Sequence, residues 1–263
     1  MSAGPTARRR RRRAPLATVA VAGAVALSSL GLSACGSSSA SPSPPPASFG
    51  IVQDRPVPQV PLVDQAGRPT SLAAYRGKAV VMADFLSLCQ DECPLITGAF
   101  ISMQHDLRAA GLADKVTFLE VSVDPDRDTP ARLTAYSQQF GADWPLLTGT
   151  PPDLAQLWKF FGVDYQKVPE DQPPMLDWWT HQPLAYDVDH TDGFILLDAK
   201  GNERFITTSP PNLHGQLQPS LRNLLNDGGI QNLEHQQTPS WTLPQAVSAL
   251  SWLLGRNIPQ AGG

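Results

Sequence analysis

Two cysteines, Cys89 and Cys93, are separated by three residues and followed at once by Pro94 in the stretch Cys-Gln-Asp-Glu-Cys-Pro. The apolar, β-branched segment 79–85 before them predicts a buried strand, and the segment 95–112 after them predicts a helix with Pro94 in its first turn. Unpaired N–H groups at the start of a helix favour negative charge and therefore the thiolate form of cysteine. Because the thiolate is both the nucleophile and the metal-binding form, the pair predicts dithiol chemistry or a metal site.

The spacing of the two cysteines tolerates a metal more readily than a disulfide. At positions i and i+4 of a regular helix, two Cβ atoms lie about 5–6 Å apart, whereas a disulfide needs about 3.8 Å. A metal with M–S bonds of about 2.3 Å bridges the wider separation, but a disulfide requires an irregular backbone. Asp91 and Glu92, between the cysteines, either raise the pKa of the thiols or face water.

The first 34 residues have the pattern of a bacterial secretory signal. A basic run, 8–13, precedes an apolar stretch, 17–32, and Leu-Ser-Ala-Cys at 32–35 resembles a lipobox. We predict a lipoprotein signal peptide over 1–34 and lipidation of Cys35, which anchors the chain to the outer face of the bacterial cell membrane. An uncleaved membrane anchor is the alternative, and both place the rest of the chain outside the cytoplasm. The arginine run does not separate general secretory from twin-arginine export.

The composition of the remaining chain argues against nucleic-acid binding. Removing the six arginines of residues 1–34 from the 20 basic residues leaves 14 against 24 acidic residues, a formal charge of −10. Proteins that bind nucleic acids usually carry basic patches instead. With three cysteines in all, one of them at the lipobox, the sequence is not that of a disulfide scaffold.

Strands and helices alternate along the chain. We predict strands over 57–63, 79–85, 116–123, 145–147, 193–197 and 204–207, and helices over 72–76, 95–112, 130–140, 152–161, 216–226 and 243–254. The alternation, closed by a late hairpin, predicts one mixed α/β sheet flanked by helices. The Ser/Ala/Pro-rich composition predicts a disordered, flexible tether over 35–50, followed by a single domain over 51–226 and a C-terminal extension over 227–263.

A metal held by two thiolates would be completed by a third ligand, and the five histidines are the candidates. Soft thiolates select Cu(I), and imidazole adds affinity for Cu(II). His190 lies just before the predicted strand 193–197, which can lie beside the cysteine motif. His181 is the rival, in a long polar insertion over 168–186. Surface positions are predicted for the other three: His105, His214 and His235.

Asp124 follows the predicted strand 116–123, whose end should lie near the cysteine motif. Its carboxylate could tune the site or handle protons, or it could simply cap the loop before Pro125. Trp178 and Trp179 are interpreted either as a docking surface for a partner or as cover for the insertion's own core.

Three motifs, in order, resemble the Sco/SenC family of copper-binding, thioredoxin-fold proteins of cytochrome oxidase assembly. They are Cys-x-x-x-Cys-Pro after an apolar strand, the stretch 121–130 (Val-Ser-Val-Asp-Pro-Asp-Arg-Asp-Thr-Pro) and the stretch 188–198 (Val-Asp-His-Thr-Asp-Gly-Phe-Ile-Leu-Leu-Asp). The resemblance covers about residues 59–226. The sequence departs from the family at Ser87-Leu88, where more polar residues are usual, in the long insertion and in the C-terminal extension.

The resemblance implies a thioredoxin-like fold and one copper ion, Cu(I) or Cu(II), bound by Cys89, Cys93 and His190. It also implies a membrane-tethered metallochaperone that delivers copper to the dinuclear copper site of a cytochrome c oxidase subunit, with an exported copper donor as a further partner. The alternative is a thiol–disulfide oxidoreductase with Cys89 and Cys93 as its redox-active pair, which would keep the oxidase cysteines or other exported thiols reduced. A thiol peroxidase fits less well, because 85–89 lacks the threonine of a peroxidatic motif.

Overall fold

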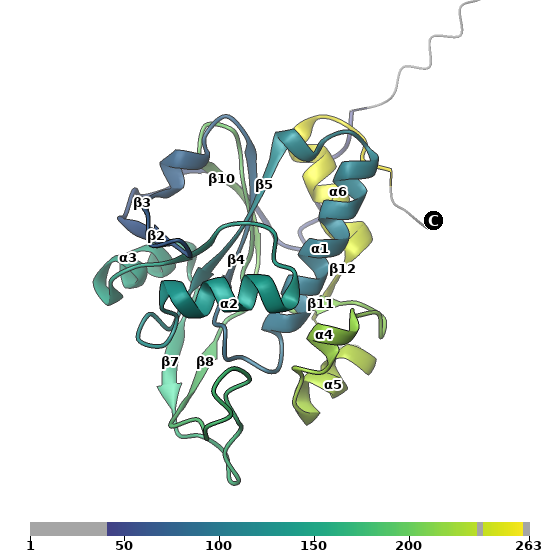
Figure 1. The fold of residues 1–263 in the computed structure, drawn as a ribbon. Helices are drawn as coiled ribbons and strands as arrows, with labels where there is room; N and C mark the ends of the chain where they lie inside the picture. Colours follow the sequence, from purple (N-terminus) through teal and green to yellow (C-terminus); the bar gives the residue numbers. More distant parts are fainter. Residues whose placement is uncertain (1–40, 236–238, 260–263) are drawn as a thin grey trace, which may run out of the picture. The chain divides into compact units, whose positions relative to one another are not determined.

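The structure is a computed structural model that describes residues 41–235 and 239–259. Its centre is an eight-stranded mixed sheet with the strand order β1-β10-β9-β4-β5-β6-β2-β3 (Figure 1). The strands are β1 (Ile51–Pro56), β2 (Leu62–Asp64), β3 (Pro69–Thr70), β4 (Ala79–Phe85), β5 (Val116–Ser122), β6 (Leu146–Thr148), β9 (Phe194–Leu197) and β10 (Asn202–Thr207). The parallel strands β4 and β5 lie at the middle, and β9 runs antiparallel to β4.

Helices flank this sheet, which confirms the predicted mixed α/β architecture. They are the 3₁₀ turns η1 (Leu72–Tyr75) and η2 (Ala113–Lys115) and the helices α1 (Cys93–Ala109), α2 (Pro130–Phe140), α3 (Pro151–Phe161), α4 (Pro219–Arg222), α5 (Asp227–Glu234) and α6 (Leu243–Leu254). In the view of Figure 1, α2 crosses in front of the strands, and α1 contacts α6 beside them.

The start and end of α2 follow from local chemistry. Thr129 accepts a hydrogen bond from the backbone N–H of Arg132, and Pro130 fits the first turn because its missing N–H would have no partner there. Gly141 ends the helix in the left-handed region at φ 77°. The same devices, a capping threonine, an early proline and a terminal glycine, bound α3.

Strand β4 is buried along its whole length. It pairs residue by residue with β5 from Ala79–Val116 to Phe85–Ser122, and with β9 on its other side. Each fully buried aliphatic side chain here contributes about 1.5–3 kcal/mol to stability. The chain therefore leaves the sheet at a fixed point after Phe85, and the cysteine loop, whose first residues are still buried, begins there.

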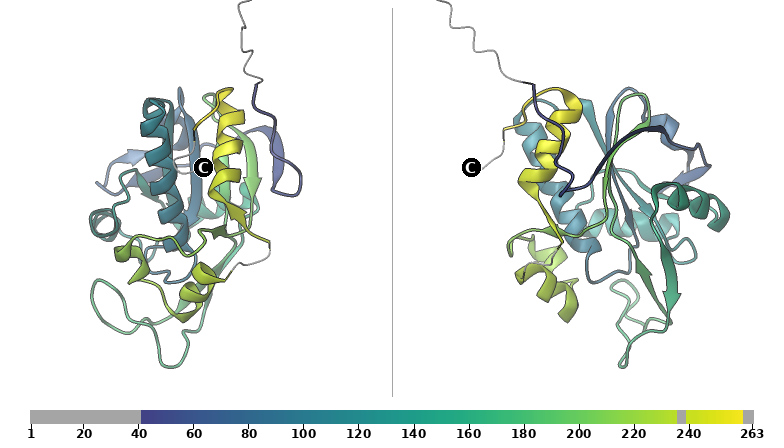
Figure 2. Two further views of the ribbon diagram at one scale, coloured as in Figure 1. Left: turned by 90° about the vertical axis from the view of Figure 1, so that its right-hand side faces the viewer. Right: turned by 180° about the vertical axis from the view of Figure 1, so that it is seen from behind.

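A separate two-stranded ribbon carries the insertion. Strands β7 (Tyr165–Val168) and β8 (Asp187–His190) pair antiparallel, with Tyr165 opposite His190. The loop 169–186 between them projects from the end of the molecule where α4 and α5 lie (Figure 2). The short strands β11 (Pro211–Asn212) and β12 (Trp241–Thr242) form another, parallel pair.

Two predicted elements differ from those observed. Most of the predicted strand 57–63 is instead the link between β1 and β2, and only 62–63 lie in a strand, because Pro58 and Pro61 lack the N–H groups that a sheet interior needs. The predicted helix 216–226 is only the four-residue α4. It ends early because Asn226 caps a new helix, α5, by accepting a hydrogen bond from the N–H of Gly229.

The C-terminal extension packs on the core rather than projecting from it. Trp241 is 0% exposed, and its ring centroid lies 4.8 Å from that of Phe194 in β9. Helix α6 has the predicted bounds and buries Ala246, Val247 and Leu250. The segment is thus an extension in sequence but a layer of the fold in space.

At the N-terminal side, Phe49 is buried and its ring packs against those of Phe205 and Phe194. The ordered core therefore begins within the segment predicted as a tether. The predicted signal peptide, Cys35 and the rest of 1–40 lie outside the described residues. Among the helices that the structure does describe, none has the length and hydrophobicity needed to cross a membrane.

Candidate metal centre

The two cysteines lie where β4 gives way to α1. Cys89 lies in the connecting loop, held by a hydrogen bond from its N–H to the carbonyl of Leu86 at 3.2 Å, and Cys93 is the first residue of α1. The N–H of Cys93 donates to the sulfur of Cys89 at 3.4 Å. Both thiols are free and buried. The predicted position at a helix N-terminus is therefore observed, with a backbone N–H aimed at one sulfur.

His190, at the end of β8, completes a three-residue cluster. Its Nε2 lies 3.5 Å from the sulfur of Cys93, and the ligand atoms of Cys89, Cys93 and His190 all lie within 4.8 Å of one another. Metal bonds of about 2.0–2.3 Å to nitrogen and sulfur can span at most about 4.6 Å between two ligand atoms. A small closing movement would therefore let all three side chains bind one ion. The structure brings the three predicted ligands together, and their role as ligands stays a prediction.

Asp84 is a site residue that the sequence analysis missed. It is 2% exposed in β4, and its carboxylate accepts hydrogen bonds from Nδ1 of His190 at 2.6 Å and from the N–H of Gly193 at 2.5 Å. A hydrogen bond at Nδ1 fixes the ring orientation and leaves Nε2 facing the sulfurs as a lone-pair donor for a metal. The available signal was an acid inside the apolar run Ala-Val-Val-Met-Ala-Asp-Phe.

The two thiols differ in acidity. The hydrogen bond from Cys93 lowers the pKa of Cys89 well below its ordinary value, against the effect of burial, and His190 lowers it further. Burial raises the pKa of Cys93 well above its ordinary value, and the negative charge of Cys89 adds to this. Burial alone would lower the pKa of His190, but Asp84 and Cys89 raise it. These shifts favour the thiolate at Cys89, the thiol at Cys93 and the protonated ring at His190 when no metal is bound.

Acidic side chains surround the cluster. Burial raises the pKa of Asp91 to about 6, of Glu92 to about 8 and of Asp192 to about 7, with smaller contributions from neighbouring charges. Asp91 and Glu92 line a cavity of about 240 Å³ together with Cys89 and His190. Asp91 and Glu92 therefore neither simply face water nor lie far from the sulfurs. A cation bound in the cluster would lower both raised pKa values and so favour the ionised carboxylates.

The C-terminal extension braces the cysteine loop. The side-chain amide of Asn232 in α5 donates to Asp91 at 2.7 Å and to Glu92 at 2.6 Å, and the N–H of Asn226 donates to the carbonyl of Gln90 at 2.7 Å. A Cβ on Gly229 would lie 2.7 Å from that same carbonyl, so only glycine allows α5 to approach this closely. Residues far along the chain therefore hold the loop between the cysteines.

Ser87, where the sequence departs from the family, fixes the start of the loop. Its N–H and hydroxyl both donate to the buried carboxylate of Asp128, which also accepts from Ser122 at the end of β5. The carbonyl of Ser87 accepts a hydrogen bond from Trp178 at 2.7 Å. Trp178 packs on Tyr136 and Phe140 of α2, so it anchors the insertion to the main core, whereas Trp179 is 45% exposed.

The remaining candidates lie outside the cluster. Asp124 is buried and pairs with Arg127 and with the hydroxyl of Tyr186, so its described contacts do not include the predicted ligands. The predicted tuning role stays a prediction without a direct contact. His181, the rival ligand, lies exposed in the loop 169–186 and does not join the cluster. The other histidines are also exposed: His105, His214 and His235.

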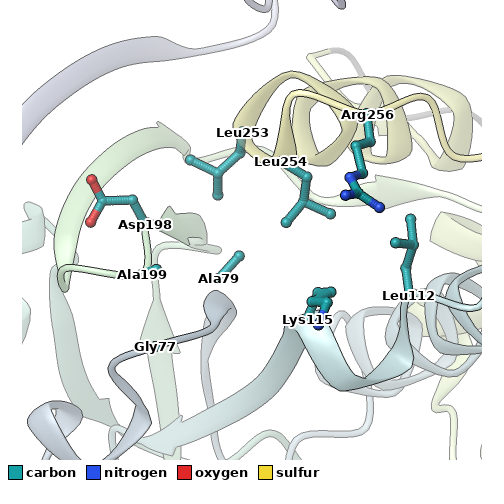
Figure 3. A pocket seen from close by; sticks show the side chains of 9 residues that line it. All are labelled: Gly77, Ala79, Leu112, Lys115, Asp198, Ala199, Leu253, Leu254 and Arg256. Atoms are coloured by element: carbon teal, nitrogen blue, oxygen red, sulfur yellow. The ribbon is translucent and has the colours of Figure 1, made fainter.

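A further cavity of about 280 Å³ lies at the opposite end of β4 (Figure 3). Its wall includes Ala79, the first residue of β4, and Leu253 and Leu254 from the end of α6. None of the predicted metal ligands lines it, so it is separate from the candidate centre.

The sequence of this chain is similar to that of a known protein family. Residues 54–220, more than half of the 263-residue chain, match the model of the SCO1/SenC family. The chain belongs to the SCO1/SenC family. A protein named putative copper-binding protein from Stutzerimonas stutzeri is 26% identical over 175 residues, which cover 66% of this chain and 79% of that protein.

The mitochondrial members of the SCO1/SenC family are longer. Protein SCO2 homolog, mitochondrial, from Bos taurus is 30% identical over 140 residues, which cover 53% of this chain and 49% of that protein. The chain thus spans about half the length of this relative.

The crystal structure of Arabidopsis thaliana ScoI with copper bound gives a TM-score of 0.50 at 19% identity, covering 68% of this chain and 92% of that one. This likeness confirms the predicted thioredoxin-like fold. Together, the relatives and the thiol–imidazole cluster support copper as the metal of the centre.

Proposed function

We propose that this SCO1/SenC protein is a copper metallochaperone that carries one copper ion on Cys89, Cys93 and His190. The observation that carries the proposal is the cluster itself, two thiols and one imidazole within 4.8 Å, on a fold whose bacterial relative is named as copper-binding. Sulfur ligands select Cu(I), and the imidazole extends binding to Cu(II). Copper is the cargo here, so the protein needs no catalytic turnover.

The residues divide the work of holding copper. The lowered pKa of Cys89 favours its thiolate, and copper binding would displace the proton of Cys93 and the Nε2 proton of His190. His190 offers Nε2, because Asp84 holds its Nδ1–H. Asp91 and Glu92 line the same cavity, and a bound cation would favour their ionised forms over the neutral forms that burial favours.

The destination of the copper is the dinuclear copper site of a cytochrome c oxidase subunit, and an exported protein supplies it. This part of the proposal rests on the resemblance to the family. The location, on the outer face of the bacterial cell membrane through a lipid on Cys35, rests on the lipobox-like motif at 32–35. A lipid anchor would keep the carrier close to a membrane-embedded oxidase.

The test is His190→Ala, with the exposed histidine change His105→Ala as its matched control. Wild-type protein, reduced and titrated anaerobically, should bind one equivalent of copper, and its Cu(II) form should absorb in the visible through sulfur-to-metal charge transfer. His190→Ala should weaken Cu(II) binding strongly, because imidazole matters more to the harder ion, while two thiolates still hold Cu(I). Oxidase copper loading in cells should fall with His190→Ala and stay normal with His105→Ala.

Normal loading in the His190→Ala cells, together with wild-type protein that binds no copper, would overturn the chaperone proposal. The second candidate function, a thiol–disulfide oxidoreductase, would then remain. It is favoured by the unequal thiols: Cys89 as thiolate attacks a substrate disulfide, one substrate thiolate leaves, and Cys93 resolves the mixed disulfide. That chemistry does not need His190.

A further inference from the structure

The cavity beside the candidate centre is lined by a thioether as well as by a thiol. Its wall includes Cys89, His190 and Met175, which lies in the loop 169–186. Cys93 does not line it, so Cys89 and His190 are the predicted ligands that face the open side of the cluster. A metal entering or leaving on this side passes Met175.

The loop holds Met175 at this wall through several contacts. The side-chain amide of Gln90, in the cysteine loop, donates to the carbonyl of Leu176 at 2.7 Å. The N–H of Met175 donates to Glu170 at 3.2 Å, and its carbonyl accepts from the N–H of Leu184 at 2.8 Å. These bonds tie the backbone of Met175 to its own loop, and they tie its neighbour Leu176 to Gln90, the residue next to Cys89.

The thioether itself is oriented by a polar partner. The side-chain amide of Asn226 donates to Sδ of Met175 at 3.4 Å, and Asn226 also lines the cavity. The other lining residues are mainly acidic or amide side chains, among them Asp91, Glu92 and Asp187. Met175 is half-buried and packs against the hydrophobic core, so its thioether lies at the border between that core and this polar wall.

From this geometry we propose that Met175 is a further copper ligand, which binds Cu(I) through Sδ on the cavity side of the centre. A thioether is soft and uncharged, so it suits Cu(I) rather than Cu(II). The side chain is unbranched with three rotatable bonds, so Sδ can turn from Asn226 toward the metal across a cavity of about 240 Å³. Met175 then offers the ion a sulfur outside the thiolate pair, from which a partner can take it.

The role of Met175 rests on the proposed copper site, and X-ray absorption tests the Met175 ligand and the thiolate ligands separately. The full chain is produced with selenomethionine and loaded anaerobically with Cu(I). Copper–selenium scattering is expected from Met175, because Met82 and Met103 are 0% and 1% exposed in the core. Met1 is labelled as well, so the Met175→Leu variant is what assigns the signal. Labelled Met175→Leu should lose that signal and keep copper–sulfur scattering. Copper–sulfur scattering without copper–selenium in the wild type overturns the role of Met175 alone, and absent thiolate scattering overturns the site itself.

A competition titration gives an independent readout. Met175→Leu keeps size and hydrophobicity, and it should weaken Cu(I) binding against a Cu(I) chelator by about tenfold, equivalent to about 1.4 kcal/mol. Cu(II) binding should not change. The control is Leu176→Ala, because that neighbouring side chain is exposed and outside the cavity lining. Unchanged Cu(I) affinity in Met175→Leu, or an equal loss in Leu176→Ala, contradicts the proposal.

Discussion

Asp84 decides which nitrogen of His190 faces the two sulfur atoms. A carboxylate in the middle of a buried strand is costly unless it is hydrogen-bonded, and Asp84 accepts from both His190 and Gly193. The first bond selects the ring tautomer, and the second holds the turn between β8 and β9. At the residue scale, the centre is therefore set by one acid that is not itself among the predicted ligands.

We expect Asp84→Asn to weaken Cu(II) binding by about 10–100-fold, the usual effect of losing the partner of a ligating histidine. The amide can donate to Nδ1, which would put the ring proton on Nε2 and block metal binding there. Cu(I), held by two thiolates, should be affected less. Chelator competition and the visible charge-transfer band measure both. Glu203→Gln, a change at another buried acid that pairs with Arg55, is the control. An equal effect of the two changes would argue against a positioning role for Asp84.

At the element scale, the centre joins three pieces of chain. The β4–α1 loop carries the cysteines, β8 carries His190, and α5 closes over the loop between the cysteines. Strands β7 and β8 flank the insertion, whose Trp178 and Leu176 make hydrogen bonds to Ser87 and Gln90 of the cysteine loop. Helix α5 belongs to the C-terminal extension, so both departures from the family help to hold this loop. Helix α5 approaches the cysteine loop closely at Gly229, where an added Cβ would lie 2.7 Å from the carbonyl oxygen of Gln90.

Gly229→Ala should destabilise the protein by about 1–3 kcal/mol, because the new methyl group would overlap the carbonyl of Gln90 and the side chain of Leu225. The displaced loop should also bind copper less tightly. Urea unfolding of the metal-free protein and copper titration measure the two effects. Gln231→Ala, an exposed change in the same helix, should alter neither. Wild-type stability in Gly229→Ala would show that α5 can move away from the loop at no cost.

At the scale of the whole molecule, the centre and the cavity of Figure 3 lie at opposite ends of β4. The core between them is continuous, from Phe49 to the end of α6, and it includes Trp241 and Leu250 of the extension. The elements that carry the candidate metal centre therefore pack on one continuous hydrophobic core.

We expect Cys35→Ala to release the protein from the membrane fraction or to stall its processing, because a lipobox cysteine is the lipidated residue. Fractionation of cells and the mass of the mature chain measure this. Cys89→Ser, which alters the centre and leaves residue 35 intact, should fractionate as wild type. An unchanged mature mass together with unchanged membrane association of Cys35→Ala would reject the lipid anchor.

Local patterns in the sequence determined the elements and the cysteine pair. β4, α2 and α6 have the predicted bounds, because apolar periodicity, proline in the first turn and glycine after the last turn act within a few residues. Copper was also within reach of the sequence, since two thiols at one strand–helix junction and a later histidine restrict the chemistry.

Only the tertiary structure decided which side chains meet the thiols. His190 is 97 residues from Cys93 and 106 from Asp84, so their contacts depend on the pairing of β8 with β7 and of β4 with β9. The bracing by Asn232 and the position of Met175 depend in the same way on how α5 and the loop 169–186 fold back. No local preference encodes such contacts, because they arise when distant segments bury their apolar faces against one core.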